Sequence, residues 1–168
     1  MKAGLAQRIT QFPGSDWLPQ VSSWLVRHLA FVALPVVLTC GCSTFNRDWK
    51  KVAEQPPQPD SIEGRWEGKW LSDVNGHTGR LRCLLSPEGD SRYQARFRAT
   101  YWKVFRFSYT VPLQFEQRDG LWHFTGEEDL GKLAGGIYSY EGRATPTDFF
   151  STYRSKYDHG IFQMERPE

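Results

Sequence analysis

Apolar and polar residues alternate with a period of two through most of the chain after residue 61. Over residues 92–101, tyrosine, alanine and phenylalanine hold the odd positions and mostly arginine holds the even ones. The same alternation runs from Phe105 to Phe115. In a strand, a period of two places the apolar side chains on one face and the polar ones on the other, whereas a helix would scatter both sets. The pattern predicts half-buried β-strands.

Turn residues divide this region into about eight strands. Asn75-Gly76 and Asp119-Gly120 are typical of two-residue hairpin connections. Gly135-Gly136 and Thr145-Pro146 mark two further turns. The predicted strands cover residues 64–72, 79–86, 92–101, 104–116, 121–127, 136–145, 148–155 and 160–166.

Short connections between successive strands favour an antiparallel meander, and closure into a barrel removes the exposed sheet edges. The sequence therefore predicts an all-β fold over residues 61–168, a small closed or nearly closed barrel. A barrel of this size can be filled by side chains or can hold one small ligand. The expected inward side chains include Trp66, Trp70, Leu81, Cys83, Leu85, Phe97, Phe107, Tyr109, Trp122, Phe124, Tyr138, Tyr140, Phe162 and Met164.

The first predicted strand opens with Gly64-Arg65-Trp66, and a second copy of this pattern, Gly68-Lys69-Trp70, follows at once. This opening is similar to the Gly-x-Trp start of lipocalin and avidin-like barrels. The resemblance implies a calycin-like barrel. The resemblance does not imply a particular ligand, because it covers only these few residues.

An apolar run from Leu29 to Leu38 follows Arg27 and His28. A positive residue, an apolar segment and then small residues form the layout of an export signal. The run is shorter than the roughly 20 apolar residues that a membrane span needs. Extending it back to Val21 would bury Arg27 in the bilayer at a cost of about 3 kcal/mol. Residues 1–41 are therefore interpreted as an export signal with a long N-terminal extension, and a permanent span is the weaker alternative.

The end of this run, Leu38-Thr39-Cys40-Gly41-Cys42, resembles the lipobox of bacterial lipoproteins. The resemblance implies that Cys42 is acylated, for example with palmitate, and anchors the chain to a membrane after signal cleavage. Thr39 departs from the usual leucine, and Cys40 is a poorer candidate because Thr39 precedes it. Ser43 resembles an outer-membrane sorting signal, which implies a site facing the periplasm. Plain secretion is the alternative.

Residues 42–60 contain Cys42 and then a polar stretch with Pro56, Pro57 and Pro59. Proline-rich segments are extended and semi-rigid, so the stretch is predicted to be a tether between membrane and barrel. With Cys40 removed and Cys42 acylated, Cys83 remains alone and no intrachain disulfide is expected.

The formal net charge of +2 does not suggest a nucleic-acid partner. Three histidines, His77, His123 and His159, lack the local spacing of metal ligands. No Gly-x-Ser-x-Gly elbow is present, and Cys83 is interpreted as a core residue. The protein is accordingly predicted not to be an enzyme and to need neither metal nor cofactor.

Four arginines, Arg92, Arg96, Arg98 and Arg106, lie on the polar face of two adjacent predicted strands. Such a row could meet phosphate, acidic glycans or lipid headgroups. The simpler interpretation is a solvated outer face that opposes aggregation.

The densest polar and aromatic stretch is residues 151–160, at the end of one strand and the following turn. These side chains could line the mouth of the barrel, or could form a hairpin whose charges pair and whose tyrosines cover the core. The candidate ligand residues are Trp66, Trp70, Tyr138, Tyr140, Tyr153, Arg154, Lys156, Asp158 and His159.

The resulting hypothesis is a lipid-anchored envelope protein that binds an apolar or amphipathic small ligand without catalysis. The alternative is a structural or interaction lipoprotein whose barrel is filled and has no pocket. The oligomeric state does not follow from the pattern.

Overall fold

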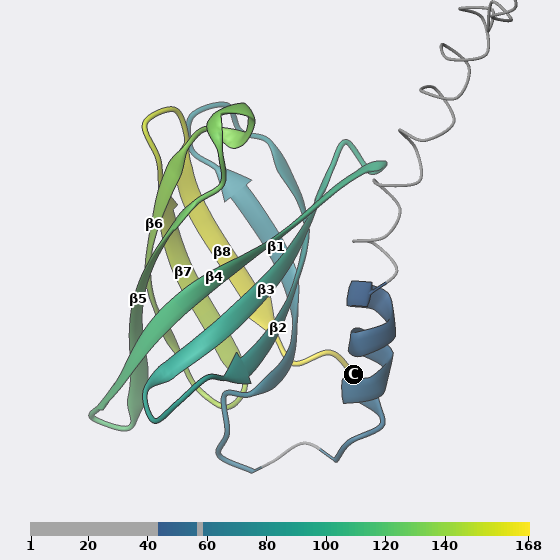
Figure 1. The fold of residues 1–168 in the computed structure, drawn as a ribbon, viewed down its shortest axis with the longest axis vertical. Coiled ribbons are helices and arrows are strands. Elements are labelled where there is room, and N and C mark those ends of the chain that lie inside the picture. Colours follow the sequence, from purple (N-terminus) through teal and green to yellow (C-terminus); the bar gives the residue numbers. More distant parts are fainter. Residues whose placement is uncertain (1–43, 57–58) are drawn as a thin grey trace, which may run out of the picture. The chain divides into compact units, whose positions relative to one another are not determined.

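A closed antiparallel barrel forms the main body of the protein (Figure 1). The computed structural model describes residues 44–56 and 59–168, so the predicted export signal and Cys42 lie outside the described residues. Each strand pairs with its neighbours in sequence, and the last strand closes the barrel against the first. The strands are β1 (Gly64–Ser72), β2 (Thr78–Pro87), β3 (Arg92–Tyr101), β4 (Phe105–Arg118), β5 (Leu121–Asp129), β6 (Ile137–Ala144), β7 (Asp148–Arg154) and β8 (His159–Glu165), with a short 3-10 helix η1 (Lys132–Ala134) between β5 and β6.

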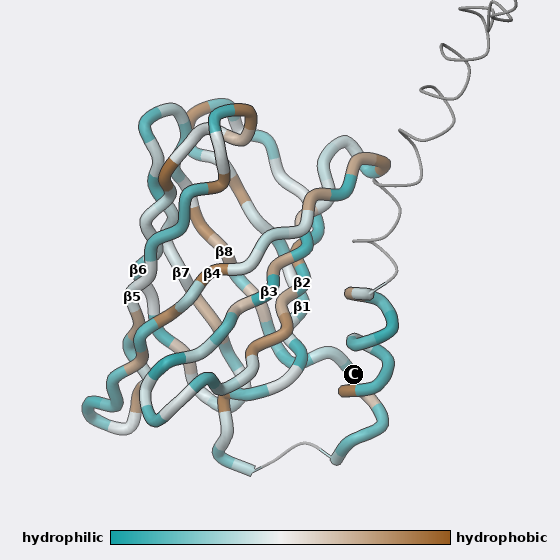
Figure 2. The backbone as a smooth tube through the Cα atoms, viewed as in Figure 1, coloured by the Kyte–Doolittle hydropathy of each residue, from teal (hydrophilic) through white to brown (hydrophobic). Residues whose placement is uncertain are grey.

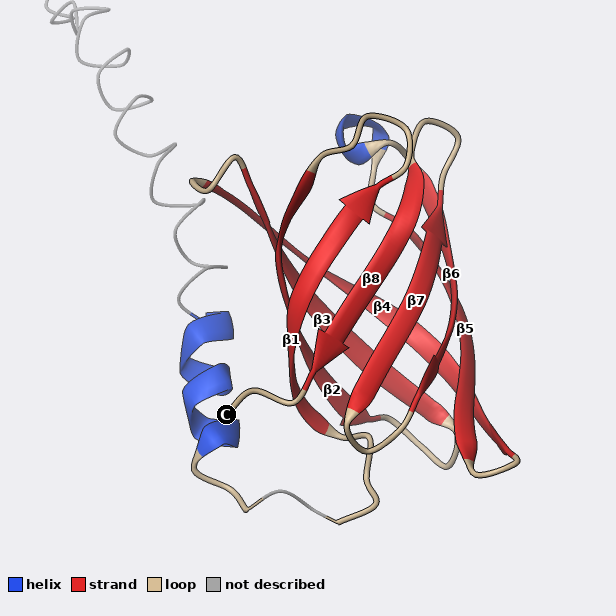
Figure 3. Ribbon diagram, turned by 180° about the vertical axis from the view of Figure 1, so that it is seen from behind, coloured by secondary structure: helices blue, strands red, loops and turns tan. Residues whose placement is uncertain are grey.

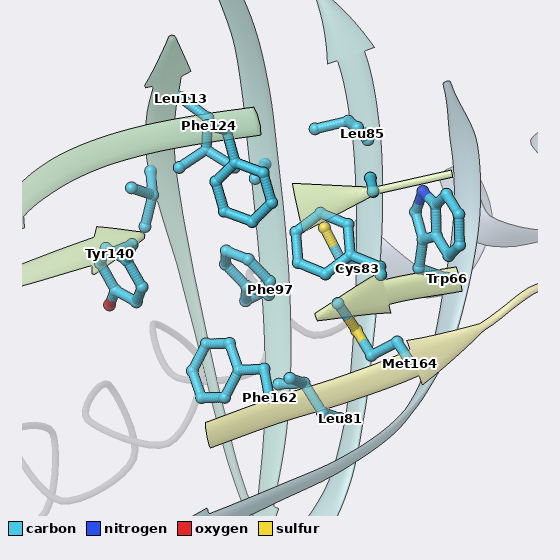
Figure 4. Close-up of a cluster of buried hydrophobic side chains, with 14 of the residues drawn as sticks. Trp66, Leu81, Cys83, Leu85, Phe97, Leu113, Phe124, Tyr140, Phe162 and Met164 are labelled. Carbon is cyan, nitrogen blue, oxygen red and sulfur yellow. The ribbon is translucent and has the colours of Figure 1, made fainter. Parts of the chain in front are cut away.

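The predicted all-β meander is confirmed, and the predicted strand ends agree with the observed ones to within two residues. The alternation that predicted the strands also sets the inside and outside of the barrel. Trp66, Leu81 and Cys83 are fully buried, and Phe97 is 1% exposed. Figure 4 shows these side chains meeting in the interior with Phe124, Phe162 and others.

The antiparallel order gathers the connections at two opposite ends. The open end is formed by residues 73–77, 102–104, 130–136 and 155–158, and the closed end by residues 88–91, 119–120 and 145–147. Trp66 lies toward the closed end, where its indole nitrogen donates a hydrogen bond of 2.9 Å to the carbonyl of Ile62. Its ring packs on Phe149 with a centroid distance of 5.6 Å. Large side chains therefore fill this half of the barrel.

Gly68 brings β1 and β8 into close approach. A Cβ atom at this position would lie 2.0 Å from the carbonyl oxygen of Gln163 on β8. Glycine allows backbones to approach where a side chain would clash. The second Gly-x-Trp copy thus has a packing reason: Gly68 permits the contact, and the Trp70 indole bonds to the carbonyl of Thr100 at 3.2 Å.

Residues 44–53 form a helix, here called the outer helix, against the outside of the barrel (Figure 3). Phe45 and Trp49 are 1% and 8% exposed and pack with Leu84 of β2. Residues four apart share one face of a helix, so both aromatic rings are buried together. Within the described residues, no helix has the length and apolar content needed to cross a bilayer.

An extended tether was predicted over residues 42–60. This prediction is wrong for residues 44–53, which form the outer helix. The prolines that suggested extension follow the helix rather than interrupt it. The outer helix also covers part of the arginine row, which was expected to be solvated. Arg96 donates to Asp48 at 2.8 Å, and Arg98, only 5% exposed, donates to Asn46 at 2.7 Å.

Candidate functional site

The open end of the barrel holds a cavity of about 540 Å³. Pockets for small ligands typically measure about 300 to 1,000 Å³, so one small molecule fits. Aromatic side chains dominate the walls. The lining residues are Trp70, Ala99, Tyr101, Phe107, Tyr109, Leu130, Leu133, Ala134, Gly135, Tyr138, Tyr153, Tyr157, Asp158 and Phe162.

The strands place these side chains around the cavity, because the inward-facing positions continue along each strand as far as the open end. Ala99 takes the inward position between Phe97 and Tyr101 on β3, and its short side chain leaves space where a larger one would fill the barrel. Phe97 packs below the cavity, with ring centroids 5.4 Å from both Tyr109 and Phe162. These rings separate the cavity from the filled half.

Asp158 is the single carboxylate of the lining. Ser72, which is buried, donates a hydrogen bond of 2.6 Å to one of its oxygens. The hydroxyl of Tyr153 donates to the other at 3.2 Å. Both oxygens therefore have partners from the protein, and these bonds fix the carboxylate at the edge of the cavity.

Burial raises the pKa of several tyrosines in and below the cavity. Desolvation is the main cause for Tyr109, Tyr140 and Tyr153, and the negative charge of Asp158 adds to it for Tyr153. The pKa of Tyr101 is raised by the same burial. At neutral pH these phenols keep their protons, so the cavity offers apolar ring faces and neutral hydroxyl groups.

Four of the predicted ligand residues line the cavity together: Trp70, Tyr138, Tyr153 and Asp158. Tyr140 lies one layer deeper, 3% exposed, with its ring centroid 6.4 Å from that of Tyr138.

The structure places the other predicted residues elsewhere. Trp66 is fully buried in the half of the barrel near the closed end. Arg154 and His159 are exposed, because they follow and precede the inward positions of Tyr153 and Gly160. Lys156 is also exposed and lies over the Tyr157 ring at 5.2 Å. Strand alternation therefore separates Tyr153 from Arg154 and His159, whereas Lys156 and Tyr157 lie together in the connection between β7 and β8.

Sequence reasoning missed the contribution of the connection between β5 and β6. Leu130, Leu133 and Ala134 come from this segment and line the cavity. Tyr101 on β3 was likewise absent from the predicted site. The alternation over residues 92–101 contained the signal for Tyr101, but nothing local indicates that a loop folds over the mouth of a barrel.

Two further features that the sequence raised, the Cys83 thiol and a metal site, can be checked in the described residues. Cys83 is fully buried, and burial raises the pKa of its thiol, which agrees with its predicted role in the core. Across residues 44–56 and 59–168, no three His, Cys, Asp or Glu side chains gather as a metal site requires.

No protein-family model matches the chain, and no curated protein matches its sequence. Two designed proteins of known structure have a similar barrel. One is a redesigned β-barrel, mFAP1, bound to DFHBI, with 13% identity and a TM-score of 0.48. The other is a de novo designed fluorescence-activating β-barrel, with 14% identity and a TM-score of 0.44. Each match covers 63% of this chain and 94% of the designed chain, and the likeness concerns the barrel alone.

Proposed function

We propose that this protein is a non-catalytic binding module that takes one apolar or amphipathic small molecule into the open-end cavity. The observation that carries the proposal is the cavity itself, about 540 Å³ and walled mainly by aromatic rings. Moving an apolar ligand from water onto such walls is favourable in proportion to the area buried. Tyrosine hydroxyl groups would orient the polar part of the ligand.

The polar groups of the cavity narrow the ligand class. Asp158 is negative, and the hydroxyls of Tyr101, Tyr109 and Tyr153 are neutral at physiological pH. A ligand whose polar end is neutral or cationic suits this set better than an anionic one, because a buried like charge opposes binding. The alternative function, a filled barrel that serves only as an interaction surface, does not account for the space above Phe97.

Titration with the neutral dye N-phenyl-1-naphthylamine tests the proposal on the full chain carrying Cys42→Ala. We expect saturable binding, and we expect Ala99→Phe to weaken it by about tenfold or more, because the added ring occupies ligand space. Thr152→Phe is the matched control, since it adds the same ring to the exposed face of β7. Equal binding by the parent and Ala99→Phe chains would favour the interaction-surface alternative.

We further propose that Cys42 is acylated and holds the protein in the cell envelope, at the outer membrane and facing the periplasm. The lipobox-like residues before Cys42 support this location. Acyl chains contribute about 0.8 kcal/mol per buried methylene, so more than one chain anchors a protein stably. Metabolic labelling with a fatty acid should tag the parent chain and Cys40→Ala but not Cys42→Ala. Label retained in Cys42→Ala would reject this anchor.

A further inference from the structure

The exposed large hydrophobic side chains of the described residues all lie at one end of the barrel. They come from the four connections of the open end and the strand ends beside them. Figure 2 shows hydrophobic colour at the tip of the β3–β4 hairpin and in the connection between β5 and β6. The residues are Val74, Tyr101, Trp102, Val104, Phe105, Phe107, Leu133, Ile137 and Tyr157.

This distribution is unlike that of an ordinary soluble surface, where exposed hydrophobic residues are scattered singly. Trp102 is 71% exposed, and Leu133 is fully exposed. The connections of the closed end contain Glu88, Asp90 and Asp119, and no lysine or arginine. The open-end connections contain three lysines and two aspartates, Asp73 and Asp158, so the two ends differ both in hydrophobic exposure and in net charge.

Three of the four open-end connections each carry one exposed lysine: Lys103, Lys132 and Lys156. Lys103 lies between Trp102 and Val104, and Arg106 follows Phe105. Aromatic rings among basic side chains fit the water interface of a membrane, where the rings sit at headgroup level. The lysines are attracted to anionic headgroups. This charge complementarity favours a bilayer over a purely apolar protein partner.

A basic groove adjoins the same hairpin on the outer wall. Its lining includes Arg80, Arg98, Lys103 and Arg106, together with Asn46 of the outer helix. The outer helix thus begins beside the hairpin. Cys42 precedes Asn46 by four residues, a span of at most about 14 Å of extended chain. An anchor at Cys42 would therefore bring a membrane close to the open end.

We infer that the open end of the barrel docks on a bilayer surface that contains anionic phospholipid. The aromatic side chains of the β3–β4 hairpin lie in the interface, and the three lysines lie among the headgroups. The inference goes beyond ligand binding, and it implies that the cavity mouth faces lipid. A ligand would then enter from the membrane rather than from water.

The experiment uses the full chain in vesicles of phosphatidylcholine with phosphatidylglycerol. An environment-sensitive fluorescent amino acid replaces Leu133 at the open end, and a second sample carries it in place of Asp90 at the closed end. We expect a blue shift and quenching by brominated lipid at position 133 and neither effect at position 90. Equal emission at the two positions would overturn the inference even if Cys42 is acylated, because attachment alone does not orient the barrel.

Surface variants make the test specific. With the probe at position 133, Trp102→Ser combined with Phe105→Ser should remove most of the quenching, whereas Phe150→Ser on the side wall should not. Lys103→Glu should weaken the response on anionic vesicles only, with Lys51→Glu on the outer helix as its control. A blue shift that depends on protein concentration and occurs without vesicles would instead show that the open end binds a second copy of the chain. Quenching unaffected by the hairpin variants would also contradict the inference.

Discussion

The guanidinium of Arg166 lies 4.0 Å from the centroid of the Trp66 ring. It also donates hydrogen bonds of 2.5 and 2.6 Å to the carbonyls of Ser61 and Glu63, and one of 2.9 Å to the carbonyl of Pro146. A guanidinium has five N–H donors in a fixed plane, which suits such a set of acceptors. One side chain beyond β8 therefore joins the segment before β1 to the connection between β6 and β7.

Arg166→Ala should lower the free energy of unfolding by about 3 kcal/mol, because it removes a cation–π contact and charge-assisted hydrogen bonds. Urea unfolding followed by tryptophan emission measures the change. Arg166→Lys should recover only part of the loss, since an ammonium cannot span the same carbonyls. Arg154→Ala, on the exposed face of β7, should change stability by less than about 0.5 kcal/mol. Equal effects of Arg166→Ala and Arg154→Ala would contradict this role.

Alkaline pH should destabilise the barrel through its buried tyrosines. The pKa of Tyr140 and Tyr153 is raised in the folded protein, mainly by burial. Below about pH 10, the ordinary tyrosine pKa, both folded and unfolded chains keep these protons. Above it the unfolded chain releases protons that the folded chain retains, so stability falls by about 1.4 kcal/mol per pH unit for each such tyrosine.

Urea unfolding at several values above pH 10 measures this slope. Tyr140→Phe should make the fall shallower by the contribution of one proton. An unchanged slope in Tyr140→Phe would mean that this hydroxyl ionises equally in the folded and unfolded chains.

Trp49→Ala should release the outer helix from the barrel. Trp49 stacks on Phe45 at a centroid distance of 5.8 Å, and Arg82 lies over its ring at 5.0 Å. Replacing a buried tryptophan with alanine lowers the free energy of unfolding by about 3 kcal/mol or more. If the helix detaches, the loss is limited to the free energy with which the helix docks on the barrel. Hydrogen exchange should show faster amides in residues 44–53 and unchanged protection in β3 and β7.

Lys51→Ala, exposed on the same helix, is the control and should leave exchange unchanged. If the strands lose protection together with residues 44–53 in Trp49→Ala, the outer helix and the barrel unfold as one unit, and the prediction of separate release is wrong.

Gly68→Ala should destabilise the barrel by about 2 kcal/mol or more, because the new methyl group would push β8 away from β1. The clash is with a backbone carbonyl, that of Gln163, which a rotamer change cannot relieve. Gly89→Ala is the matched control, since a Cβ there has no atom within 4 Å. Thermal unfolding of the two variants gives the comparison, and equal melting temperatures would show that the strands move apart without cost.

Part of the candidate site could be predicted from sequence. Trp70, Tyr138, Tyr153 and Asp158 line one cavity, as their pattern and position suggested. The separation of Arg154 from Tyr153 follows from the same period of two that defined the strands. Trp66 was misplaced for a different reason: the Gly-x-Trp pattern marks a strand, but it does not say toward which end of the barrel the tryptophan lies.

The outer helix is an element that the local sequence pattern did not predict. The prolines that follow the helix in the sequence favoured an extended tether, whereas Phe45 and Trp49 are spaced for one helical face. Only the barrel wall around Leu84 supplies the surface that buries them. Short helices are marginal in water and depend on such packing, so the helix follows from a tertiary contact.

The order of apolar and polar residues by itself determined the strands and their inward face, because alternation with a period of two is a property of each strand alone. It also determined the antiparallel meander, because short turns join strands that are neighbours in the sequence. Closure of β8 on β1 brought together positions far apart in sequence. Only that closure decided which inward positions fill the core and which surround a cavity, because filling depends on the combined size of side chains from several strands. The gathering of exposed aromatic side chains and lysines at one end arises in the same way, from connections that are separate in the chain and adjacent in the barrel.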